Sequence, residues 1–142
     1  MLLLTFGASL PAQSVLTTSY ASTHYLSSLD GGVYFDLTVH TGLHLDRLDI
    51  NLLSPPGTPG TVEVFVRPGT WGGNVTGTAD WVLAASGPVV AAGSDLPTPC
   101  LLSSPIGLPP GTHGIALHVR GAMPLYTFAF QPRSFANADL RL

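Results

Sequence analysis

The segment whose residue types point most clearly to a binding function is Thr70-Trp-Gly-Gly-Asn-Val-Thr-Gly-Thr78. It sets Trp71 among glycines and hydroxyl side chains, and an exposed indole is a stacking surface for a sugar ring. Side chains that can hydrogen-bond sugar hydroxyls follow at Asn74, Thr76 and Thr78. These four residues predict a ligand-binding site. The alternative is that Trp71 folds back and closes one end of the fold.

The second tryptophan, Trp81, opens a β-prone run directly after Asp80, and we expect it to lie in the core. Asn74-Val-Thr76 also matches the acceptor pattern for N-glycosylation, which matters only in a host that modifies such sites. The two tryptophans therefore receive different expected roles, Trp71 in binding and Trp81 in packing.

Five histidines raise the question of a transition-metal site. His40 and His44 are four residues apart, but they flank a glycine turn and so do not share a helix face. His118 falls on the outer face of a predicted strand, whereas His24 and His113 fall near strand starts. Three imidazoles could bind zinc only if the sheet order brought their strands together. We expect no bound transition metal.

Calcium is the remaining cofactor candidate, because carboxylate and carbonyl oxygens of loops are its usual ligands. Four acidic residues fall at turns or loop edges: Asp30, Asp46, Asp49 and Asp95. They do not follow the spacing of a calcium-binding loop. We therefore expect no cofactor, with calcium as the open alternative.

The sequence contains no catalytic signature. Gly-x-Ser-x-Gly, His-Glu-x-x-His, a phosphate-binding glycine loop and paired cysteines are all missing. Glu63, the single glutamate, points outward in its strand, where we expect an ion pair with Arg67 or Arg47. Cys100, the single cysteine, lies in an apolar run and is expected to be buried. We expect a protein that is not an enzyme; a small hydrolase whose site assembles from distant strands is the alternative.

The elements that must position these residues are β-strands. Val33–His40 and Val62–Arg67 alternate apolar and polar side chains, the pattern of a strand with one buried face. In Leu45–Leu53 the phase changes, which predicts a β-bulge near Asp46. Further strands are expected at Ser14–Tyr20, Trp81–Ser86, Val89–Ala92, His113–Arg120, Leu125–Phe130 and Ala138–Leu142.

Turn signals separate these strands. The chain has 13 Pro and 16 Gly, which leaves little room for helices. Pro-Gly-Thr occurs at 56–58, 59–61, 68–70 and 110–112, each a type II turn candidate, and Gly87-Pro88 predicts a hairpin. The expected fold is all-β: an antiparallel, jelly-roll-like β-sandwich of about nine or ten short strands with almost no helix.

Residues 1–12 carry the targeting signal. Leu2–Leu10 is a short apolar run followed by Pro11-Ala-Gln13, which is similar to the end of a secretory signal peptide. An ordinary first strand is the alternative. We expect a secreted, extracellular single domain over residues 13–142. Its last strand stops at Leu142 with no closing segment, which predicts a domain truncated at its C-terminus and an exposed apolar edge.

The charge balance excludes several partner classes. Only 9% of the residues are charged, lysine is missing and the net charge is −3, so no basic face is available for nucleic acid or an anionic membrane. The apolar N-terminal run is too short to span a bilayer. Such a weakly charged surface favours association with itself or with a neutral polymer.

The order of the strands resembles a β-sandwich domain found in secreted proteins of planctomycete-like and related environmental bacteria. The resemblance covers about Gly31 to Leu142. It implies an extracellular β-sandwich and no catalytic motif, and it assigns no function to any residue. The residues that carry it are Tyr34-Phe-Asp-Leu-Thr-Val39, Leu48-Asp-Ile-Asn51, Val62-Glu-Val-Phe-Val-Arg-Pro-Gly-Thr70, Asp80-Trp-Val-Leu83 and Asn137-Ala-Asp-Leu140.

From these observations we expect a secreted, non-catalytic module that binds a glycan or another surface polymer in an adhesive role. The first alternative is a structural subunit of an extracellular assembly. In that case Leu2–Leu10 supplies a missing strand by β-strand addition, or the edge at Leu142 requires one.

Overall fold

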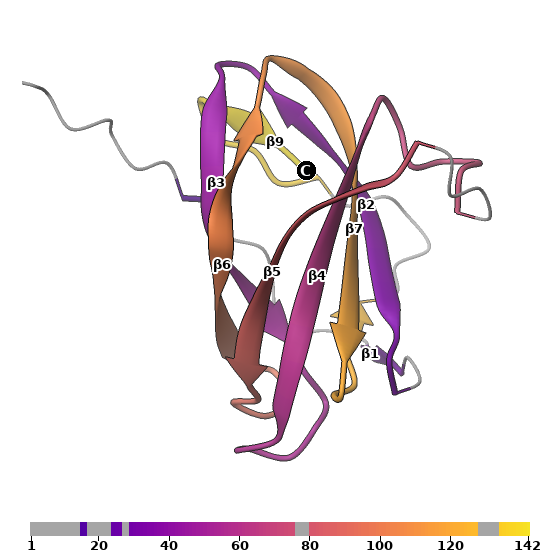
Figure 1. Cartoon of the computed structure of the whole chain (residues 1–142), viewed down its shortest axis with the longest axis vertical. Coiled ribbons are helices and arrows are strands. Elements are labelled where there is room, and N and C mark those ends of the chain that lie inside the picture. Colours follow the sequence, from indigo (N-terminus) through magenta and orange to yellow (C-terminus); the bar gives the residue numbers. More distant parts are fainter. Residues whose placement is uncertain (1–14, 17–23, 27–28, 76–79, 128–133) are drawn as a thin grey trace, which may run out of the picture.

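The computed structural model describes residues 15–16, 24–26, 29–75, 80–127 and 134–142, and these contain nine strands and no helix (Figure 1). The predicted all-β class is confirmed. None of the described residues forms a helix with the length and hydropathy needed to cross a membrane. The strands are β1 His24–Leu26, β2 Gly32–Val39, β3 Leu43–Asn51, β4 Pro59–Pro68, β5 Val82–Val90, β6 Pro97–Leu108, β7 Gly111–Arg120, β8 Leu125–Thr127 and β9 Leu140–Arg141.

The larger layer is a five-stranded antiparallel sheet with the order β5-β4-β7-β2-β9. The facing layer consists of two antiparallel pairs, β3 with β6 and β1 with β8. A bridge between Leu52 and Pro124, and a hydrogen bond of 2.9 Å from the Leu53 N–H to the Met123 carbonyl, connect β3 to the start of β8. Figure 1 shows the two layers packed face to face.

The core between the layers is built from the alternating apolar residues that the sequence assigns to it. Val62 and Val64 of β4, and Leu52 just past β3, are completely buried, and Ile115 and Val119 of β7 are 1% exposed. One contiguous cluster includes side chains from β2, β3, β4, β5, β6, β7 and β9. Burial of such side chains is the main favourable contribution to folding. The outward residues of the same strands form the outer faces of the two layers.

The predicted bulge near Asp46 is confirmed, because the β3–β6 register shifts between Leu45 and Arg47. Across this shift β3 advances two residues, from Leu45 to Arg47, whereas β6 advances five, from Ile106 to Leu101, so the extra residues lie on β6. Leu45 and Leu48 can then both pack against the core despite their opposite phases in a regular strand.

The predicted hairpin at Gly87-Pro88 is wrong, because β5 runs through both residues without interruption. Gly87 does not form a turn; its missing side chain lets β6 approach β5 closely. A Cβ there would lie 2.3 Å from the Leu101 carbonyl oxygen and 2.7 Å from Cys100 Sγ on β6. Pro88 is tolerated because β5 is the edge strand of its sheet and needs no second ladder.

Three of the four Pro-Gly-Thr segments place their glycine at positive φ: Gly57 at 87°, Gly69 at 74° and Gly111 at 137°. The fourth prediction is wrong, since Gly60 lies inside β4. A Cβ on Gly60 would sit 2.8 Å from the Arg120 carbonyl oxygen, so this glycine too permits close strand approach. The same three-residue motif therefore has two structural roles.

Several predicted segments are only partly covered by the description. Residues 1–14 lie outside it, and Ser14–Tyr20 is described only at Val15 and Leu16, which form no strand. In the predicted strand Leu125–Phe130, β8 covers Leu125–Thr127 and the rest lies outside the described residues. The last predicted strand forms β9, which pairs with Thr38 and Val39 at the end of the sheet order. Leu142 beside it packs partly buried against the core.

Candidate functional site

The outer face of the five-stranded sheet carries an aromatic cluster. Tyr34 of β2 and Phe65 of β4 both lie opposite Ala116 of the intervening β7, and this small residue separates their rings. The His118 ring contacts both rings, at centroid distances of 5.8 Å from Tyr34 and 5.0 Å from Phe65. A hydrogen bond of 2.9 Å joins the Tyr34 hydroxyl to His118 Nε2. These contacts hold the Tyr34 ring in one orientation.

Trp81 belongs to this outer cluster. Its ring meets Tyr34 edge-on at 5.9 Å, and the Arg67 guanidinium carbon lies 5.8 Å from its centroid. The expectation that Trp81 lies in the core is wrong, because it packs on the outside of the sheet and is not a member of the buried cluster. The physical reason is that its indole N–H has a polar partner there, the Asn74 carbonyl oxygen at 2.9 Å.

Arg67 lies beneath this cluster with its side chain only 12% exposed. Its Nη2 pairs with the exposed Asp80 carboxylate at 3.4 Å, while its buried Nε has no hydrogen-bond partner among the described residues. The guanidinium is therefore committed to packing and to Asp80.

Trp71 is half-buried, on a loop that crosses the outer face of the sheet after β4. Its ring lies 6.2 Å from the Tyr34 ring at an angle of 34°. The Trp71 backbone N–H donates to Asp36 Oδ1 at 2.8 Å, so a residue of β2 anchors the loop. The indole neither projects freely into solvent nor closes an end between the layers.

Asn74 stabilises the same loop from within. Its Nδ2 donates to the carbonyl oxygens of Thr70 at 3.2 Å and Gly72 at 2.8 Å. Those contacts use the donors that the predicted binding role would need. Thr76 and Thr78 lie outside the described residues.

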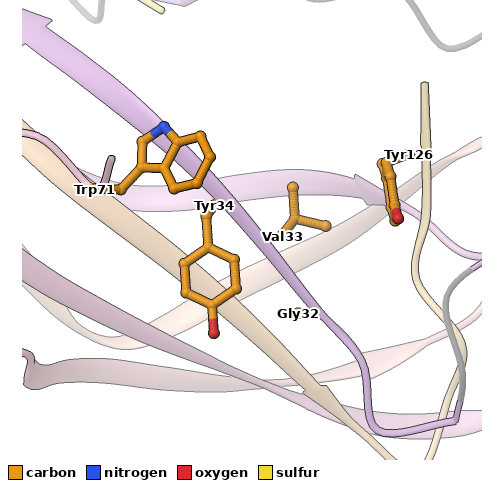
Figure 2. A pocket seen from close by; sticks show the side chains of 5 residues that line it. All are labelled: Gly32, Val33, Tyr34, Trp71 and Tyr126. Carbon is orange, nitrogen blue, oxygen red and sulfur yellow. The ribbon is translucent and has the colours of Figure 1, made fainter. Parts of the chain in front are cut away.

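A hollow of about 210 Å³ opens beside Trp71. Three of its five lining residues are aromatic, and they come from three separate parts of the chain: the β2 strand, the loop after β4, and β8. Figure 2 shows the Trp71 and Tyr34 rings at one end and Tyr126 at the other, with Val33 between them. The lining residues are Gly32, Val33, Tyr34, Trp71 and Tyr126.

Of the residues in and beside this hollow, the sequence-based prediction names Trp71 but not Tyr34, Tyr126 or Asp36. The signal for Tyr34 was present, since strict alternation in β2 puts it on the outward face. A large aromatic side chain facing outward on a central strand needs cover, and that need could have drawn attention to it. No sequence pattern indicates that Tyr126 of the facing layer lies on the same hollow.

Glu63 forms the expected cross-strand ion pair, but its partner is Arg120 on β7, with 3.3 Å between Glu63 Oε2 and Arg120 Nε. Arg67 turns to Asp80 and Arg47 pairs with Asp49 on β3 at 3.2 Å. Each pair is partly exposed and contributes at most about 1 kcal/mol to stability.

Within the described residues, no three His, Cys, Asp or Glu side chains gather as a metal would require. His113 Nε2 contacts the Pro109 carbonyl oxygen at 2.8 Å, away from the Tyr34–His118 pair. Asp30 accepts from the Gly121 N–H at 2.7 Å, and the Asp95 backbone N–H is hydrogen-bonded to Asn51. Of the four acidic residues weighed for calcium, Asp30, Asp49 and Asp95 thus have separate local partners.

Cys100 on β6 is completely buried, as predicted. Burial away from water raises the pKa of its thiol, which keeps the side chain neutral and unreactive. Comparison of the chain with protein-family models, with curated proteins and with solved structures finds no match in any of the three.

Proposed function

We propose that the chain is a secreted, non-catalytic β-sandwich module that binds a neutral glycan in the hollow beside Trp71. The observation that carries this proposal is the set of three aromatic rings, Tyr34, Trp71 and Tyr126, around one open depression. Aromatic faces stack on the apolar C–H faces of sugar rings, and Tyr126 adds a hydroxyl group.

The charges around the hollow favour a neutral ligand. None of its five lining residues is an Asp, Glu, Lys, Arg or His, and the nearby Asp36 carboxylate is occupied by the Trp71 loop. Arg67 is directed to Asp80 and to the Trp81 ring. The net charge of −3 also disfavours polyanions.

The size of the hollow favours a short contact with a long polymer. Pockets for drug-sized ligands measure roughly 300–1,000 Å³, and this one measures about 210 Å³. It therefore suits one sugar ring of a chain that continues over the open surface. Secretion, supported by the signal-peptide-like composition of residues 1–12, would bring the module to such polymers.

The test is retention of the purified protein on cellulose, xylan, mannan and chitin, compared with Trp71→Ala. Loss of a central stacking ring should weaken binding by about 10- to 100-fold. Leu101→Thr is the matched control, since Leu101 is 70% exposed on the outer face of β6 in the other layer. Equal retention of wild type and Trp71→Ala would contradict the proposal. Release of reducing ends from a retained polymer would support a hydrolase instead.

One observation favours the assembly alternative. Within the described residues, β9 pairs with β2 only at Thr38 and Val39, so the stretch Gly32–Leu37 pairs on one side only, with β7. An open edge can accept a further strand, for which Leu2–Leu10 of another copy is the candidate. Size-exclusion profiles with and without residues 1–12 test this. Concentration-dependent oligomers that vanish on deletion would favour assembly over glycan binding.

A further inference from the structure

We infer that Asp36 is the positioning residue for Trp71: it fixes the indole over the hollow before any ligand arrives. This inference rests on the proposed function for its consequence in binding. Its structural part, the orientation of a ring by a carboxylate on another strand, is testable without a ligand.

The Asp36 carboxylate uses both oxygens on one loop. Oδ2 accepts from the Thr70 hydroxyl at 2.7 Å, and Oδ1 accepts from the Trp71 backbone N–H at 2.8 Å. Charge-assisted bonds of this length are about twice as strong as neutral ones. Because the second bond ends on the backbone of Trp71 itself, any displacement of Asp36 moves the base of the indole.

Asp36 also relates the two rings at one end of the hollow, Tyr34 and Trp71. Residues two apart in a strand share a face, so Asp36 and Tyr34 stand side by side on the outer face of β2. Tyr34 lines this end directly, and Asp36 binds the loop that holds the neighbouring Trp71 ring, whose centroid is 6.2 Å from that of Tyr34. A single strand thus sets the spacing of both rings.

Hydrogen bonds within the loop connect the anchored backbone of Trp71 to its neighbours. Gly69 and Gly73, both at a φ of 74°, turn the chain on either side of Trp71. The Asn74 side chain binds two loop carbonyls, and the Asn74 N–H donates to the Trp71 carbonyl oxygen at 2.9 Å. These bonds join Thr70–Asn74 internally, and Asp36 attaches this segment to β2.

Gly114 provides the seat for the loop. It lies opposite Asp36 on one side and Arg67 on the other in the sheet register. A Cβ there would sit 2.9 Å from the Trp71 backbone nitrogen and 2.8 Å from Arg67 Cγ. The bare backbone at this point lets the loop lie against the sheet, within reach of the Asp36 carboxylate.

The first experiment uses the full chain without ligand and measures acrylamide quenching of tryptophan fluorescence. The chain has two tryptophans, so Trp71→Phe identifies the share of the signal that comes from Trp71. Asp36→Ala should raise quenching of that share, and Asp36→Asn, which keeps an acceptor for the Trp71 N–H, should raise it less. Asp49→Ala, an exposed carboxylate variant on β3, is the control. Unchanged quenching in Asp36→Ala overturns the inference.

The second experiment is a double-mutant cycle on whichever of cellulose, xylan, mannan or chitin retains the wild type. Asp36→Ala should weaken binding about 3- to 10-fold, the cost of ordering one mobile side chain. In the Trp71→Ala background it should have no further effect, because Asp36 acts through the indole. An equal loss in both backgrounds would show a general structural role and overturn the inference. If Trp71→Ala binds like wild type, the proposed function fails while the quenching result still decides the positioning.

Discussion

The two outer faces of the sandwich use the same alternation of side chains and arrive at different surfaces. On the five-stranded sheet, Tyr34, Phe65 and His118 interlock and a loop lies over them. On the β3–β6 pair, the outward residues are largely exposed: Leu101 is 70% exposed, and the Arg47 side chain 56%. A ring in the first region is held by neighbouring rings, whereas the named side chains of the second are mostly exposed to solvent. Fixed neighbours are what a preorganised binding surface requires.

The largest effect that separates the two faces is expected from Tyr34→Ala. The Tyr34 ring contacts Trp71, Trp81 and His118, so its removal takes one ring contact from each of them. We expect a loss of about 2–4 kcal/mol in unfolding free energy, near the low end for large-to-small changes in packed sites. Urea denaturation measures it. Tyr34→Phe, which loses only the hydroxyl bond to His118, should cost about 1 kcal/mol. Equal costs for the two variants would mean that the ring contacts contribute nothing.

The sequence predicted the strands better than the surfaces they form. Alternation in β2, β4 and β7 correctly assigned Val62, Val64 and Ile115 to the buried face and Tyr34 and Phe65 to the outer face. It could do so because a strand with one buried face shows an apolar residue at every second position of its own sequence. It could not indicate that Asp36 would anchor a loop more than thirty residues further on. That contact depends on strand order, which places β4 and β2 on either side of β7.

Gly87 and Trp81 are two positions where the local sequence signal was clear and the prediction was nevertheless wrong. Gly-Pro is a strong local turn signal, yet β5 continues through it because β6 approaches within contact of Gly87. Trp81 is a large apolar side chain of the kind expected in a core, yet it packs on the outer face of the sheet, because its indole N–H donates there to the Asn74 carbonyl oxygen. In both cases a tertiary contact overrides a correct local preference.

The next effect tests whether the loop that carries Trp71 needs a residue without a side chain at Gly114, where it lies against the sheet. Gly114→Ala should destabilise the protein by about 1–3 kcal/mol, as overpacking of a filled site does, because the new Cβ would meet both Arg67 and the Trp71 backbone. Gly107→Ala on β6 is the matched control, since its Cβ would be 3.7 Å from His44, an ordinary contact distance. Thermal melting of both variants gives the comparison. Similar melting temperatures for the two would show that the loop does not need the bare backbone at Gly114.

A smaller effect is expected in the pH dependence of the unfolding free energy, to which the inward residue Cys100 of β6 contributes. Burial raises the pKa of the Cys100 thiol, so the folded state keeps a proton that the unfolded chain releases. Its contribution is therefore fully present below the pKa of the unfolded thiol and is lost as pH rises from there to the folded pKa. The slope can be at most about 1.4 kcal/mol per pH unit for one group. Urea denaturation between pH 7 and 10 should show a flatter decline for Cys100→Ala than for wild type. Parallel curves would mean that another group causes the decline.

The smallest effect is expected at Leu101, the outward neighbour of Cys100. Leu101→Thr keeps a β-compatible side chain at a position that is 70% exposed, so the unfolding free energy should change by less than about 0.5 kcal/mol. The substitution also removes apolar surface from a weakly charged protein and should reduce association at high concentration, which light scattering detects. Retention on polysaccharide should stay as in wild type. If Leu101→Thr loses retention as Trp71→Ala does, the β3–β6 face also binds, and the contrast between the two faces is wrong.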